Sequence, residues 1–121
     1  MKKYLFLILF IMTFASCALP KIHMTSYSVD LSKYNKEGFY ITESNSVNFE
    51  YDPICLMGTQ GGGKQYDKNK IVKLELESVF DKFVNDCKSK GANAVINIKI
   101  IQNYSSTENT FYISGMAIKR K

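Results

Sequence analysis

The sequence has few of the side chains that bind soft metals. It contains one histidine, His23, and three cysteines, Cys17, Cys55 and Cys87. No two of them form a Cys-x-x-Cys or Cys/His cluster, whereas a structural zinc site takes about four ligands at characteristic spacing. We therefore expect no metal site and no cofactor within one chain. A metal site whose ligands come from several chains of an oligomer is the alternative.

The sequence also lacks an arrangement typical of catalysis. Glu50 and Asp52 alternate with apolar residues, as on the solvated face of a strand. A nucleophile paired with histidine would have to use His23, which lies in a polar N-terminal stretch. The candidate serine nucleophiles lie in turn-like segments: Ser44, Ser46, Ser105 and Ser106. We therefore expect that the protein is not an enzyme.

Basic residues are spread along the chain and mixed with acidic ones. The formal net charge is +5, and the basic cluster 119–121 lies at the end of the sequence. There is no basic helix and no basic stripe interleaved with aromatic residues, which excludes the usual nucleic-acid footprint. The cluster supports weak attraction to anionic surfaces at most.

The first seventeen residues, MKKYLFLILFIMTFASC, have the order of a secretory signal peptide. Two lysines precede an apolar run over 4–14, which is shorter than the roughly twenty residues of a membrane-spanning helix. The segment 14–17, Phe-Ala-Ser-Cys, resembles a bacterial lipobox, usually Leu-[Ala/Ser]-[Gly/Ala]-Cys, and departs from it at Phe14. The resemblance implies cleavage before Cys17 and a lipid on its thiol. An ordinary signal peptide with an incidental cysteine is the alternative.

A lipidated cysteine would anchor the protein to a membrane of the bacterial cell envelope, in the periplasm or at the cell surface, with the outer membrane favoured. Each buried CH₂ of fatty acyl chains such as palmitate contributes about 0.8 kcal/mol to such an anchor. We expect a signal peptide at 1–16, the lipidated cysteine and a tether at 17–36, and a single domain at 37–121.

Residues 58–65, GTQGGGKQ, come within one residue of the P-loop pattern G-x-x-x-x-G-K-[S/T]. Gln65 replaces the hydroxyl residue that would bind Mg²⁺, and no apolar strand ending in aspartate follows. Nucleotides are also scarce outside the cytoplasm. We therefore predict no nucleotide binding and interpret the segment as a flexible turn whose three glycines adopt positive φ.

Periodicity predicts one α+β domain with the order β-β-α-β-β, in which one long helix packs on an antiparallel or mixed sheet. The expected elements are strands at 38–43 and 47–57, a helix at 68–90, and strands at 93–101 and 110–118. The last two strands should form a hairpin across a polar loop at 102–110.

The predicted helix carries one apolar stripe, formed by Val72, Leu76, Val79, Phe80, Phe83 and Cys87. Asp67 or Asn69 is expected to cap its start, and Gly91 its end. Glu77 and Asp81 form a like-charge pair on the wet side, which is mildly unfavourable.

In the strands, alternation places one set of side chains on a single face: Val47, Phe49, Tyr51, Cys55 and Met57. A second set is Ala94, Ile96, Ile98 and Ile100. Pro53 marks an edge strand or a bulge, and the apolar run 54–57 suggests burial on both faces. Cys55 and Cys87 both point inward, which favours two buried thiols. A disulfide between them stays open, because an envelope compartment permits one.

Two short motifs suggest a family. Residues 91–95, Gly-Ala-Asn-Ala-Val, and 112–118, Tyr-Ile-Ser-Gly-Met-Ala-Ile, resemble those of the small YbjQ-type domains, also labelled heavy-metal-binding. The resemblance covers about residues 38–119. It implies an α+β fold and a tendency to form ring oligomers, and no established enzyme activity. In physical terms, Gly115 and Ala117 are expected to leave room where the helix crosses the last strand.

These observations favour a non-catalytic interaction or scaffold module of the cell envelope. Its expected partners are an unidentified protein or further copies of this chain, joined through a sheet face. If Tyr112, Met116 and Ile118 line the outer face of the last strand, that face is apolar and suited to an interface. The alternative is a carrier or sensor of a small ligand or a heavy metal in the periplasm.

Overall fold

The computed structural model describes residues 24, 26–64, 66–67, 70–71, 74–105 and 107–121. The fold is α+β, as predicted, with a mixed four-stranded sheet and a separate two-stranded sheet. The elements, in chain order, are α2 (Ser32–Lys36), β1 (Tyr40–Ile41), β2 (Tyr51–Lys64), β3 (Tyr66–Asp67), β4 (Lys70–Ile71), α3 (Leu76–Ser89), β5 (Ala94–Tyr104) and β6 (Glu108–Arg120).

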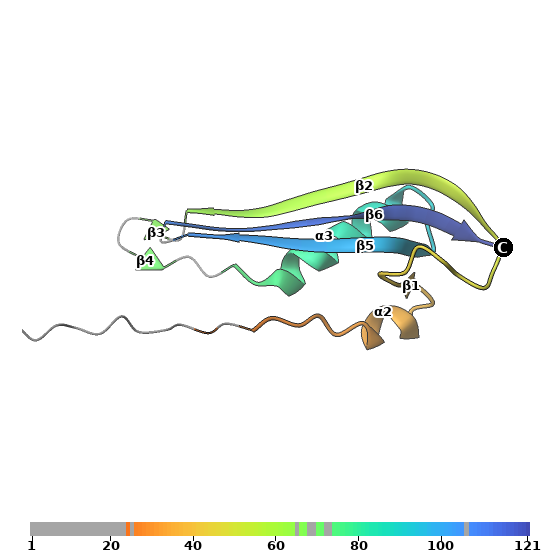
Figure 1. The fold of residues 1–121 in the computed structure, drawn as a ribbon, viewed down its shortest axis with the longest axis horizontal. Helices are drawn as coiled ribbons and strands as arrows, with labels where there is room; N and C mark the ends of the chain where they lie inside the picture. The colour runs from red at the N-terminus through yellow and green to blue at the C-terminus, as the bar shows by residue number, and fades with distance from the viewer. Residues whose placement is uncertain (1–23, 25, 65, 68–69, 72–73, 106) are drawn as a thin grey trace, which may run out of the picture.

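The four-stranded sheet has the order β1-β5-β6-β2, so the first two strands in the sequence lie at opposite edges. β5 and β6 form the predicted antiparallel hairpin, from Ala94 opposite Ile118 to Tyr104 opposite Asn109. Its strands are longer than expected and take up most of the predicted loop. β1 pairs with β5 in parallel, and β2 pairs with β6 antiparallel. Figure 1 shows β2, β6 and β5 side by side along the long axis, with α3 behind them.

Helix α3 covers one face of this sheet with the predicted stripe. Its buried side chains are Leu76, Val79, Phe80, Phe83, Val84 and Cys87. The helix begins at Leu76 rather than near residue 68, because Lys70 and Ile71 form β4 and pair with β3. Asp67 therefore belongs to a strand and is no cap. Gly91 has a φ of 86° after the helix ends, as predicted for a helix C-terminus.

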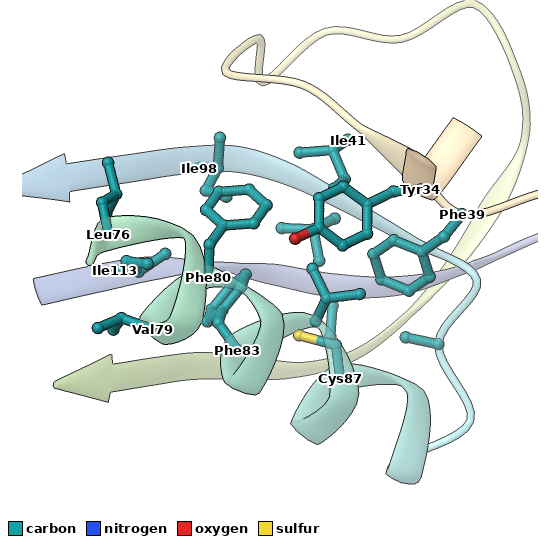
Figure 2. Close-up of a cluster of buried hydrophobic side chains, with 14 of the residues drawn as sticks. Tyr34, Phe39, Ile41, Leu76, Val79, Phe80, Phe83, Cys87, Ile98 and Ile113 are labelled. Atoms are coloured by element: carbon teal, nitrogen blue, oxygen red, sulfur yellow. The ribbon is translucent and has the colours of Figure 1, made fainter. Parts of the chain in front are cut away.

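Residues that precede position 37 also belong to the packed domain. Tyr34, in α2, is only 3% exposed and its ring lies 5.4 Å from that of Phe80. Val29 and Leu31 pack against the same core. Figure 2 shows the Tyr34 ring between Phe39 and the aromatic side chains of α3. The polar composition of the expected tether concealed these few anchoring residues.

Two bulges change which face of the sheet a strand presents. In β2 the register shifts between Pro53 and Cys55, as the proline suggested. Tyr51 therefore packs on the outer face, away from α3, while Cys55 and Met57 pack toward the helix side. The prediction that they share a face was wrong.

In β5 the register shifts between Ile96 and Lys99, and Asn97 has a positive φ of 53°. Ala94 and Ile96 lie in the outer cluster, and Ile98 lies in the core under α3. A bulge places two residues opposite one, so the alternation of faces is reset. The four residues expected on one face are divided between two.

The outer cluster covers one end of the outer face. It consists of Ala94, Ile96 and Ile118, packed under Tyr40, Val47, Phe49, Tyr51 and Met116. The Arg120 guanidinium lies 5.6 Å from the Tyr40 ring centre and 5.7 Å from that of Phe49. Residues 47–49 lie before β2, in the loop that folds over this end.

Candidate interaction surface

The rest of the outer face is uncovered by any element that the structure describes. Phe111, Ile113 and Ala117 of β6 face α3, so the residues between them face outward. Strand pairing then sets Ile101 beside Tyr112 and Leu56 beside Met116. We call these four residues the outer patch.

Large apolar side chains of the outer patch are exposed to solvent. Leu56 is 81% exposed, Ile101 62% and Tyr112 41%. Met116 joins a shallow groove of about 240 Å³, whose other lining residues are Leu56, Met57, Asn97, Lys99, Ser114 and Gly115. The prediction of an apolar outer face on the last strand thus holds for Tyr112 and Met116. Ile118 is completely buried under the outer cluster and contributes no surface.

The apolar run 54–57 is not buried on both sides, in contrast to the prediction. Ile54 is 37% exposed and Leu56 is far more so. β2 is the last strand of its sheet, so its outer-face side chains have a neighbour on one side only. Hydrophobicity alone suggested burial here; the sheet order explains the exposure.

The glycine-rich segment is part of β2 rather than a turn. Gly58 to Lys64 pair residue by residue with Ser114 to Glu108 of β6. An extended strand cannot curl its N–H groups around a phosphate as a P-loop does. Residue 65 lies outside the described residues.

Two of the glycines serve close packing. A Cβ on Gly61 would lie 2.4 Å from a methyl of Val79, because α3 approaches the strand closely here. Gly62 has a φ of 130°, and a Cβ there would lie 2.2 Å from the Asn109 carbonyl oxygen. The prediction of positive φ holds for Gly62 and Gly63, within a strand instead of a turn.

Both described cysteines are free thiols. Cys87 lies on the buried face of α3 and is fully buried, and Cys55 is half-buried and packs against the same core. Burial raises the pKa of the Cys87 thiol to about 12, and the nearby Cys55 adds to that rise. A thiol held neutral in this way is a poor nucleophile.

An ionic network that sequence patterns did not reveal joins α2 to α3. The Lys33 ammonium lies 2.8 Å from the carboxylates of both Glu77 and Asp81, and the Tyr34 hydroxyl donates to Asp81. Lys33 thus relieves the like-charge pair expected on the helix. These hydrogen bonds, from Lys33 first and then Tyr34, lower the pKa of Asp81. Lys88 of α3 also pairs with Glu37.

A pocket of about 220 Å³ lies between the N-terminal segment and the core. Its walls are mostly apolar: Val29, Leu31, Ile41, Leu76, Phe80, Ile98 and Ile100. Its polar lining residues are Tyr27, Ser28, Thr42 and Glu43.

Within the described ranges, no three His, Cys, Asp or Glu side chains gather closely enough to hold a metal ion. No helix among those residues is long and apolar enough to cross a membrane. The expected signal peptide, Cys17 and His23 lie outside the described residues, as do Asn69, Val72 and Ser106.

No family model matches the sequence, and no curated protein matches it. The fold is similar to the crystal structure of a protein of unknown function from Pediococcus pentosaceus that belongs to the DUF74 family. The two share 13% sequence identity with a TM-score of 0.51, and the match covers 69% of this chain and 99% of the other. At that identity, the likeness supports the α+β fold and nothing about activity.

Proposed function

We propose that the protein is a lipid-anchored module of the bacterial cell envelope that binds another protein through its outer patch, without catalysis. The exposure of Leu56, Ile101 and Tyr112 on one sheet face is the observation that carries this proposal. The lipobox-like segment at 14–17 supports the anchor. Kinship with the YbjQ-type domains, which rests on the short motifs at 91–95 and 112–118, is part of this proposal.

The physical argument for the outer patch is the free energy gained when its apolar side chains are removed from water. Transfer of apolar surface out of water is favourable by about 25 cal/mol per Å². Exposed apolar side chains that gather on one face among polar neighbours are typical of protein interaction sites. Lys99 and Ser114 of the groove supply such polar neighbours beside Met116. A partner would cover the apolar side chains and hydrogen-bond to the polar ones.

The anchor is tested by metabolic labelling of the full chain with a clickable fatty acid. Wild type should carry the label and sediment with membranes. Cys17→Ser should lose the label, because the acceptor thiol is gone. A label retained by the variant, or absent from wild type, would contradict the anchor.

The outer patch is tested by photo-cross-linking in cells. A photoreactive phenylalanine analogue replaces Tyr112 in one variant and Lys90, an exposed residue after α3, in the control. We expect a discrete protein adduct from position 112 and none from position 90. The absence of a discrete adduct at 112, or equal adducts at both positions, would count against the outer patch.

A second candidate function, a carrier of a small ligand, is favoured by the 220 Å³ pocket. Apolar cavities of about 150 Å³ take up benzene-sized molecules. Native mass spectrometry of protein taken directly from its membrane would show a bound mass. Ile98→Phe should displace it by filling the pocket, whereas the outer-patch variant Ile101→Lys should keep it. A protein free of bound mass would remove this candidate.

A further inference from the structure

Lys99 lies between the two pairs of residues that form the outer patch. Strand pairing arranges the outer face of β5, β6 and β2, which lie side by side in Figure 1, in rows that run across the three strands. Three successive rows are Ile96–Met116–Leu56, Lys99–Ser114–Gly58 and Ile101–Tyr112–Gln60. Lys99 is the one charged side chain among these nine positions. Positions two residues apart along a strand are about 6.8 Å apart, so apolar side chains flank this charge at close range.

The bulge in β5 directs Lys99 to the outer face. Val95 lies in the core under α3, and strict alternation would place residue 99 on that same side. The register shift between Ile96 and Lys99 resets the alternation, so Ile98 enters the core and Lys99 turns outward. Bulges often re-aim a side chain next to a functional site. A specific feature of the backbone therefore presents this ammonium group on the outer face.

Three side chains of the shallow groove in this face can donate hydrogen bonds: Asn97, Lys99 and Ser114. The other residues that line the groove are apolar or glycine, so no carboxylate lines it. Among the described residues, none of the three side chains has a hydrogen-bond or ion-pair partner. Lys99 and Ser114 are directly opposite in the sheet, so their Cβ atoms are about 4.5–5.5 Å apart. A single carboxylate can accept a hydrogen bond from both.

No described carboxylate of this chain forms an ion pair with Lys99. Glu43 belongs to a neighbouring segment, but it lines the pocket on the α3 face of the sheet. Glu108 lies opposite Lys64 at the far end of the sheet. It precedes Ser114 by six residues of β6, a distance of about 20 Å. A counter-charge for Lys99 would therefore come from a partner.

We propose that the partner of the outer patch is an acidic segment of another protein, which places an aspartate or glutamate carboxylate on Lys99 and Ser114. The inference rests on the interaction role proposed above and adds the chemistry of the partner. A partner that covers the apolar rows also removes the ammonium group between them from water. A covered charge without a counter-charge is strongly destabilising, so the same partner has to supply one. Complementary charge also fixes the register of such a contact.

The spacing of the rows defines the sequence pattern of that segment. Apolar side chains should flank the acidic one on the same face, to contact Met116 on one side and Ile101 on the other. Alternate residues of a strand are about 6.8 Å apart, and residues four apart in a helix are about 6 Å apart. Both distances match the separation of the rows. The expected pattern is apolar–acidic–apolar, at every second position of a strand or every third to fourth position of a helix.

The carboxylate is tested by zero-length cross-linking in freshly broken cells that contain the full chain. A water-soluble carbodiimide converts a carboxylate to an O-acylisourea. The lysine amine attacks this ester, an amide bond forms, and a urea leaves. Only groups already in contact are joined efficiently. Mass spectrometry of the proteolytic peptides should find Lys99 linked to an aspartate or glutamate of another protein, with apolar residues beside it in the expected pattern.

Lys99→Arg is the matched control. The guanidinium group keeps the positive charge but forms no amide under these conditions, so the link should disappear. In the chain with the photoreactive analogue at position 112, Lys99→Arg should keep the protein adduct. Lys99→Glu should lower its yield by at least about tenfold, because two carboxylates repel each other. Lys36→Glu makes the same change of charge at an exposed position of α2 and should leave the yield unchanged.

Two results would overturn the acidic partner: an adduct at position 112 that Lys99→Glu leaves at full yield, or a Lys99 that forms no link although that adduct forms. A link to a small carboxylic acid, or to a second copy of this chain, would overturn the assignment to a segment of another protein. If position 112 gives no adduct in the otherwise unchanged chain, the proposed function fails and this inference fails with it. The two failures are therefore distinguishable.

Discussion

The hydroxyl of Tyr34 donates a hydrogen bond to the Asp81 carboxylate and thereby fixes α2 against α3. The Tyr34 ring is buried, and the ammonium of its neighbour Lys33 bridges Asp81 and Glu77. The segment that leads from the proposed lipid anchor is thus part of the domain from at least this residue onward. Loosening it should loosen the core.

Two replacements of Tyr34 should distinguish the contribution of its ring to stability from that of its hydroxyl. Tyr34→Phe keeps the packing against Phe80 and loses one hydrogen bond, so unfolding should become easier by about 1 kcal/mol. Tyr34→Ala removes a buried aromatic ring and should cost about 3–5 kcal/mol. Urea unfolding monitored by circular dichroism measures both. Equal losses for the two variants would show that the ring contributes nothing.

The Lys33 network should respond to acid. The pKa of Asp81 is lowered from 3.8, so its contribution to stability is present above that value and is lost as pH falls through the folded-state pKa. The pKa of Lys33 is raised from 10.5, first by Asp81 and then by Glu77. The stabilisation that its charge provides therefore persists to alkaline pH. Lys33→Met should therefore unfold at lower temperature than wild type at neutral pH, and the difference should shrink in acid.

Lys82→Met is the control for that experiment. Lys82 pairs with Asp86 within α3 and does not reach α2. Exposed pairs of this kind contribute little, so the variant should follow wild type at each pH. A difference for Lys33→Met that stays constant into strong acid would contradict the assigned role of Asp81.

The glycines of β2 should differ in their tolerance of alanine. Gly61→Ala places a methyl group against Val79 and should destabilise the fold by about 1–3 kcal/mol. Gly58→Ala meets open space at a φ that any residue adopts and should change stability by less than about 0.5 kcal/mol. The unfolding temperatures of the two variants, compared with wild type, measure this difference. Similar behaviour would mean that α3 does not approach β2 at Gly61.

The two described thiols should react at different rates. Near pH 8 an aromatic disulfide reagent should label half-buried Cys55 in the folded protein. Cys87 should react only on unfolding, because burial holds its thiol neutral with a pKa near 12. The Cys55→Ser variant should therefore show no fast labelling. Rapid reaction of Cys87 would mean that α3 opens readily.

The helix and the hairpin of this fold are accessible from local patterns. The α3 stripe and the β5–β6 hairpin depend on periodicity within one segment, so Phe83 and Cys87 were placed correctly in the core. Bulges are different, since an inserted residue resets the alternation without a strong signal. Pro53 indicated the bulge in β2, whereas no residue of comparable signal indicates the bulge in β5 at Asn97.

The β2 edge illustrates a second limit. Glycine favours turns, so a run of three predicts a loop, and only pairing with β6 makes it a strand. Strand order determines that Leu56 is exposed, and this order follows from contacts between distant segments. Local propensity cannot supply it. The apolar outer face was predicted from Tyr112, Met116 and Ile118, of which Ile118 is buried, and without the neighbours of the patch in β2 and β5.

The most direct test of the proposed role is radical footprinting of the protein in living cells and after purification. In the purified protein Tyr112 and Ile101 should be oxidised readily, as their exposure predicts. In cells a bound partner should protect both, while Tyr104, 63% exposed at the end of β5, should stay reactive as the internal control. Equal oxidation of Tyr112 and Ile101 in the two settings would contradict an occupied outer patch.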